Sequence, residues 1–116
     1  MEKASGAIIV FMTAGSTDEA SRIAQLLVEK NLAACVQILP EMQSVYRWKG
    51  EVETQPEILI LAKTVASKFS ELETQVRAVH SYETPEIVAA PLINGSRPYL
   101  EWLSASLEAD PRNNTK

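Results

Sequence analysis

Apolar residues of this chain gather in short runs and in helical stripes, and the two patterns alternate. Residues 7–13 (AIIVFMT) form a continuous run of mostly β-branched and aromatic side chains, which predicts a buried strand. Ser16 and Glu19 have the spacing of a capping box, in which each side chain bonds a backbone N–H at the start of a helix. Asn31 suits the left-handed position that ends this helix. The apolar stripe of this helix consists of Ala20, Ile23, Ala24, Leu27 and Val28.

The next part of the chain has the alternation of a β-hairpin. Residues 33–39 (AACVQIL) predict a second strand, and residues 44–53 (SVYRWKGEVE) predict two arms joined by a turn at Lys49-Gly50. Tyr46 and Trp48 are two positions apart in the first arm and therefore share one face. Because an isolated hairpin is at best marginally stable in water, we expect another surface to cover these two aromatic side chains.

A further strand, helix and strand follow. Residues 57–64 (EILILAKT) are the most apolar run, and Gln55-Pro56 are expected to mark its start. A helix is predicted to begin near Ser67. Residues 86–92 (EIVAAPL) predict the next strand, in which Pro91 belongs at a sheet edge or a strand end because it cannot donate a ladder hydrogen bond. The apolar stripe of the helix consists of Phe69, Leu72, Val76 and Val79.

The end of the chain predicts a turn and a short helix. Asn94-Gly95 are typical turn residues, and Ser96 is expected to cap the helix. We expect residues 1–109 to form a single domain and residues 110–116 to be a disordered tail. One side of the terminal helix is lined by Leu100, Leu103 and Leu107.

The order of these elements predicts an α+β fold with two βαβ halves in tandem, which is the ferredoxin-like pattern. In this sandwich the helices cover one face of a mostly antiparallel sheet, and an extended β-hairpin and a short C-terminal helix are added. The opposite face of the sheet then needs a partner.

Composition narrows the classes of partner. The 116 residues carry a formal net charge of −4, with 46% hydrophobic and 22% charged residues, which is typical of a folded domain. The negative charge argues against nucleic acid as a partner, and no segment approaches the roughly 20 apolar residues that span a membrane. Glu2 offsets Lys3, so the apolar run that follows lacks the positive start of a secretory signal. The single cysteine, Cys35, fits a reducing compartment, and we expect a cytoplasmic protein.

Three separated motifs carry a family resemblance. They are LAACVQI at residues 32–38, SVYRWKGEVE at residues 44–53 and HSYETPEIVA at residues 80–89, followed by YLEWL at residues 99–103. Together they are similar to the motifs of the CutA family of divalent-cation tolerance proteins. The resemblance implies a homotrimer related in architecture to the PII signalling proteins, in which neighbouring subunits cover the hairpin. Its interface is expected to include Tyr46, Trp48 and Trp102.

The resemblance also implies a response to metal ions and the binding of copper, another divalent cation or a small ligand between subunits. Some bacterial relatives carry a cysteine at the end of the first strand and two adjacent histidines. In this chain Met12 stands at the first position, and Val79 and His80 stand at the other two. Ser81 replaces a usual proline, and a thioether is a poor ligand for hard divalent ions. The expected metal site consists of His80, Glu83, Glu86 and Met12.

Most of these candidates have a structural alternative. His80 either binds a metal or exchanges protons, or it lies at a helix C-terminus, where a charged imidazole is favourable. Cys35 is expected to be a small buried hydrophobe rather than a nucleophile. Tyr46 and Trp48 either pack between subunits or stack on a ligand.

The sequence favours a binding protein over an enzyme. It contains no Walker loop, no dinucleotide glycine fingerprint and no nucleophile elbow, so no catalytic residues are predicted. One alternative is a signalling or scaffold trimer of the PII type that binds a metabolite or a protein. Another is a hydrolytic or isomerising enzyme that uses His80 and a glutamate.

Overall fold

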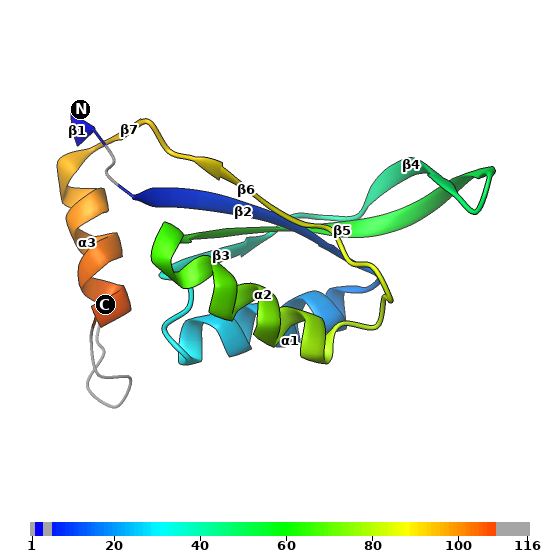
Figure 1. Ribbon diagram of the computed structural model, residues 1–116, viewed down its shortest axis with the longest axis horizontal. Coiled ribbons are helices and arrows are strands. Elements are labelled where there is room, and N and C mark those ends of the chain that lie inside the picture. Colours follow the sequence, from blue (N-terminus) through cyan, green and yellow to red (C-terminus); the bar gives the residue numbers. More distant parts are fainter. Residues whose placement is uncertain (1, 4–5, 109–116) are drawn as a thin grey trace.

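The computed structural model describes residues 2–3 and 6–108, and Figure 1 shows how its elements are arranged. In chain order they are β1 (Glu2–Lys3), β2 (Ala7–Ala14), α1 (Thr17–Glu29), β3 (Cys35–Ile38), β4 (Met42–Trp48), β5 (Glu51–Val65), a short 3-10 helix (Ala66–Lys68), α2 (Phe69–Val79), β6 (Ile87–Pro91), β7 (Asn94–Gly95) and α3 (Arg97–Glu108).

The main sheet has the strand order β3, β5, β2, β6, and all neighbouring strands are antiparallel. β4 pairs with the first part of β5 and forms the long hairpin that projects from the sheet (Figure 1). α1 and α2 lie under one face of the sheet, and α3 stands at the end of the sheet away from the hairpin (Figure 1). The predicted α+β class with an antiparallel sheet is confirmed.

The core lies between this sheet and the two helices under it. Val10 and Met12 of β2 point to the helices, are fully buried, and pair with Ala62 and Ile60 of β5. Their partners in the helices, also fully buried, are Ala20, Ile23, Leu27, Leu72 and Val76. The predicted helical stripes are therefore confirmed in their centres.

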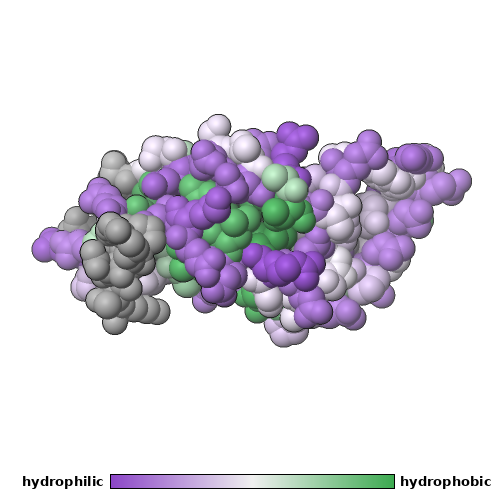
Figure 2. Space-filling view, turned by 90° about the horizontal axis from the view of Figure 1, so that it is seen from below, coloured by the Kyte–Doolittle hydropathy of each residue, from purple (hydrophilic) through white to green (hydrophobic). Residues whose placement is uncertain are grey.

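The ends of both stripes are not in the core. Val28 is 39% exposed and Val79 is 53% exposed, so the prediction that they belong to the buried faces was wrong. Each lies in the last turn of its helix. Seen from the side of the helices, hydrophobic side chains show in the middle of this face, while the hairpin arm is mostly hydrophilic (Figure 2).

The hairpin turn agrees with the sequence, but the strand after it is longer than predicted. Lys49 and Gly50 have φ values of 50° and 84°, as the favoured two-residue hairpin turn requires. β5 then runs without a break through Pro56, so the prediction that Gln55-Pro56 start a new strand was wrong. Pro56 lies opposite Gln43 in the antiparallel ladder between β4 and β5. Alternate residues of an antiparallel ladder point their N–H groups away from the partner strand. A proline is tolerated there.

The last elements differ in one respect from the prediction. Asn94-Gly95 form β7, which pairs with Glu2 and Lys3 of β1, rather than only a turn. Leu103 and Leu107 of α3 are buried as predicted. The predicted disordered tail at residues 110–116 lies outside the described residues. Within the described part of the chain, every helix lacks the length and apolar character that a membrane span needs.

Thr64 offers a test of how the core is packed. Its side chain is fully buried on the helix side of β5, and its Oγ1 has no hydrogen-bond partner among the described residues. A buried unsatisfied hydroxyl is unfavourable, so Thr64→Val is expected to raise the free energy of unfolding by about 1 kcal/mol. Urea denaturation measures the change. Thr54→Val, the same replacement at an exposed position of β5, is the control and should change little; a loss of stability in Thr64→Val would contradict the argument.

Candidate functional site

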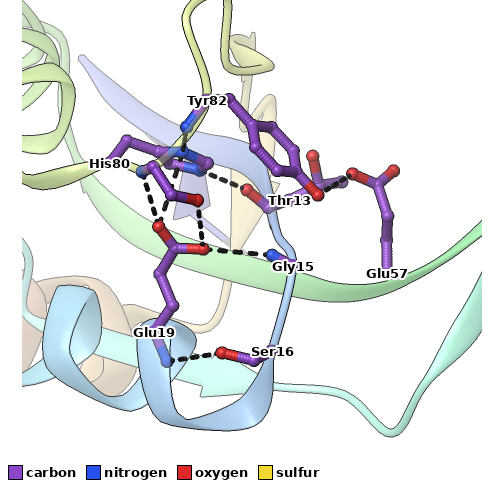
Figure 3. A network of polar contacts seen from close by, with 8 residues as sticks. Thr13, Gly15, Ser16, Glu19, Glu57, His80 and Tyr82 are labelled. Atoms are coloured by element: carbon purple, nitrogen blue, oxygen red, sulfur yellow. Dashed lines mark hydrogen bonds and ion pairs between the residues drawn. The ribbon is translucent and has the colours of Figure 1, made fainter.

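A chain of polar contacts joins the start of α1 to the loop between α2 and β6 (Figure 3). β2 ends at Ala14, and Ser16 caps α1 by accepting a hydrogen bond from the backbone N–H of Glu19 at 3.1 Å. This half of the predicted capping box is confirmed. The other half was wrong, because the Glu19 carboxylate accepts from the N–H of Gly15, at 3.1 Å, rather than from that of Ser16.

Glu19 also holds the distant loop. Its side chain is 7% exposed, and Ser81 donates to it twice, through the backbone N–H at 2.7 Å and through the hydroxyl at 3.1 Å. Burial is the largest single influence on the pKa of this carboxyl and raises it. The hydrogen bonds from Ser81 and Gly15 outweigh burial and bring the pKa below its usual value. The carboxylate is therefore ionised at neutral pH.

His80 lies at the C-terminus of α2 with its ring fully buried. Its Nε2 lies 2.7 Å from the carbonyl oxygen of Thr13, which only accepts, so Nε2 carries the proton. The backbone N–H of Tyr82 donates to Nδ1 at 3.0 Å, so that nitrogen acts as an acceptor. Both ring nitrogens are thus used within the subunit, and a metal ion at His80 would have to displace one of these bonds.

Tyr82 carries the chain of contacts outwards to β5. Its hydroxyl donates to Oε2 of Glu57 at 3.0 Å, and its ring centre is 4.7 Å from that of His80. Glu57 is only 8% exposed. Burial, and then the hydrogen bond and the charge of Glu57, raise the pKa of Tyr82 to about 12. Tyr82 is therefore a hydrogen-bond donor at neutral pH and supplies no negative charge.

Tyr82 and Glu57 form part of the wall of a cleft of about 520 Å³ at the base of the hairpin. β4 contributes the opposite part of the lining, including its two aromatic residues. The loop before β6 contributes Glu86. The lining residues that matter for the chemistry are Tyr46, Trp48, Glu57, Tyr82 and Glu86.

The predicted metal residues are only partly brought together. Glu86 lines the cleft. His80 does not line it, but accepts a hydrogen bond from the backbone N–H of Tyr82, which does. Glu83 is exposed and does not line the cleft, while Met12 is fully buried in the hydrophobic core. Among the described residues, no group of three or more His, Cys, Asp and Glu side chains is placed to hold a metal ion.

Sequence reasoning missed Glu57 and the second role of Glu19. Glu57 stands as a charged residue at the start of a very apolar run, next to Ile58, and that contrast was the available signal. Glu19 was interpreted only as a capping residue. The predicted interface residues Tyr46 and Trp48 are 41% and 43% exposed in the single subunit, and Trp102 is half-buried with its ring centre 5.4 Å from that of Tyr99.

Residues 8–106 match the protein family described as CutA1 divalent ion tolerance protein. The chain belongs to this family. The divalent-cation tolerance protein CutA of Thermus thermophilus is 48% identical over 95 residues, which cover 82% of this chain and 92% of that protein. The predicted membership of the CutA family is confirmed.

Solved CutA structures have the same fold. The structure of CutA from Xylella fastidiosa superimposes with a TM-score of 0.87 at 36% identity, covering 90% of this chain and all (100%) of that one. The structure from Archaeoglobus fulgidus, described as a periplasmic divalent cation tolerance protein CutA, gives 0.86 at 40% identity and covers 88% of this chain and 99% of that one. The arrangement of hairpin, sheet and helices is therefore that of CutA structures.

Proposed function

We propose that this chain acts in tolerance to divalent cations as a homotrimer, and that the cleft at the base of the hairpin is its ligand site. The observation that carries the proposal is the cleft itself, in which the buried Glu57 and the exposed Glu86 lie beside an aromatic wall. The proposed role is that of a cytoplasmic binding protein without catalytic activity.

The ferredoxin-like subunit of PII-type trimers is part of this proposal. Its support is the strand order, in which each βαβ unit places one strand between the two strands of the other. The face of the sheet opposite α1 and α2 carries apolar side chains, of which Val88 is 52% exposed. The others on this face are Ile9, Phe11, Leu59 and Leu61. An apolar sheet face needs a partner, and we propose two further copies of the chain.

A cation at the cleft would be held mainly by carboxylates. Glu57 and Glu86 are the acidic residues of the lining, and carboxylate oxygens suit hard divalent ions. His80 is engaged in two hydrogen bonds and Met12 lies in the core, so neither is the first ligand in this proposal. Further ligands would come from a neighbouring subunit, which closes the open side of the cleft.

Titration of the metal-free protein with Zn²⁺ and Cu²⁺ in a calorimeter tests this proposal. We expect saturable binding that is weakened at least about tenfold in Glu86→Gln, because one charged ligand is lost. Glu83→Gln is the matched control, since Glu83 lies in the same loop outside the cleft lining, and it should bind as the unchanged protein does. Equal binding by both variants would remove Glu86 from the site.

A second candidate function is that of a signalling or scaffold trimer that binds a metabolite. It is favoured by the aromatic lining of the cleft and by the absence of a three-ligand metal group among the described residues. No saturable metal binding in the calorimeter, together with an intact trimer, would favour this candidate over direct metal binding.

A further inference from the structure

The lining of the cleft has an uncompensated negative charge. None of its residues is Lys, Arg or His. Within the part of the chain that the structure describes, no ion pair involves Glu57 or Glu86. A carboxylate that is buried without a cationic partner is unfavourable, and a bound cation is one way to offset it.

Glu57 has a free acceptor that belongs to the cleft. More than nine-tenths of the residue is buried, and its Oε2 accepts from the Tyr82 hydroxyl. Its other oxygen, Oε1, has no hydrogen-bond partner among the described residues, and Figure 3 shows it turned away from Tyr82. The hydrogen bond from the Tyr82 hydroxyl orients this carboxylate.

The size and the aromatic wall of the cleft indicate the kind of cation. About 520 Å³ is within the range of small-molecule sites and much larger than a single metal ion requires. Tyr46 and Trp48 present partly exposed rings, and an ammonium group or the carbon chain that bears it is attracted to such rings.

We propose that the cleft binds a small organic cation, an alkylammonium compound whose charged group lies at Glu57 and Glu86 and whose carbon chain lies along Tyr46 and Trp48. The inference rests on the proposed function, because it takes the same cleft as the ligand site. It names the class of ligand that the lining recognises.

Calorimetric titration of the full, chelator-treated chain with 1,4-diaminobutane tests the inference. We expect saturable binding, and no binding of 1,4-butanediol, which has the same carbon chain without charge. Glu57→Gln keeps an acceptor for Tyr82 but loses the charge, and Glu86→Gln removes the other charge from an exposed position. Each is expected to weaken diamine binding at least about tenfold, while Glu83→Gln leaves it unchanged.

Several outcomes would overturn the inference. They are the absence of diamine binding, equal binding of the diol, and unchanged binding in both Glu57→Gln and Glu86→Gln. A thermal melt shows whether Glu57→Gln is folded, and Glu86→Gln decides the matter if it is not.

The same titrations separate this inference from the proposed metal site. Zn²⁺ binding without diamine binding would overturn the inference and leave the proposed function standing. Diamine binding without Zn²⁺ or Cu²⁺ binding would support the inference and remove direct metal binding.

Discussion

Replacing Glu19 with glutamine is expected to lower the free energy of unfolding by about 2–4 kcal/mol, because three donors converge on this carboxylate. Two of the donors come from Ser81, and the third is the backbone N–H of Gly15. A glutamine side chain has only one acceptor oxygen. Its NH₂ group would face a partly buried backbone N–H, so one donor would lose its partner and two donors would be brought together. Urea denaturation at a fixed protein concentration measures the loss.

Asp18→Asn is the matched control for this prediction. Asp18 is the exposed neighbour of Glu19 in the first turn of α1, and its replacement removes the same charge from the same helix N-terminus. It should cost no more than about 1 kcal/mol. Equal losses in the two variants would mean that the helix dipole, rather than the hold on the loop at Ser81, explains the effect.

The pH dependence of stability gives an independent measurement. The pKa of Glu19 is lower in the folded chain than its usual value of 4.5, so its contribution is complete above that pH. It is lost as the pH falls through the lower, folded value. The unchanged protein should therefore lose stability in acid more steeply than Glu19→Gln, which has no carboxyl group to titrate there. Parallel stability curves down to a pH of about 3 would contradict the assigned charge state.

The local patterns of the sequence predicted the turns and helix ends well, because these features depend on residues that are neighbours in the sequence. The hairpin turn at Lys49-Gly50 and the left-handed Asn31, with a φ of 56°, were both found as predicted. Pro56 shows the limit of this reasoning. A proline breaks a strand only where its N–H is needed, and that depends on which strands lie beside it.

The candidate site was harder to predict because its contacts join distant parts of the chain. Ser81 and Glu19 are 62 positions apart, and His80 and Thr13 are 67 apart. A capping box predicts a local partner for Glu19, but the folded chain offers the same carboxylate better donors from another element. Comparison of motifs likewise suggested Met12 as a ligand. The continuous apolar run around Met12 does not reveal which of its residues face the core.

Trp48→Ala is expected to dissociate the proposed trimer at concentrations where the unchanged protein stays assembled. Trp48 is 43% exposed in the single subunit, so part of the residue is available to a neighbouring copy. Truncating an aromatic side chain that is buried in an interface costs about 3–5 kcal/mol, and a symmetric trimer loses three such side chains at once. Size-exclusion chromatography with light scattering over a dilution series measures the assembly.

Two comparisons make this prediction decisive. Trp48→Phe keeps a ring at the same place on the hairpin and should remain assembled over most of the dilution series. Val79→Ala truncates a side chain that is 53% exposed at the end of α2, on the helix side of the sheet, and should leave assembly unchanged. A fully assembled Trp48→Ala protein would refute a packing role for this residue. An unchanged protein that is monomeric and folded at micromolar concentration would refute the trimer itself, because the apolar sheet face would then be stable in water without a partner.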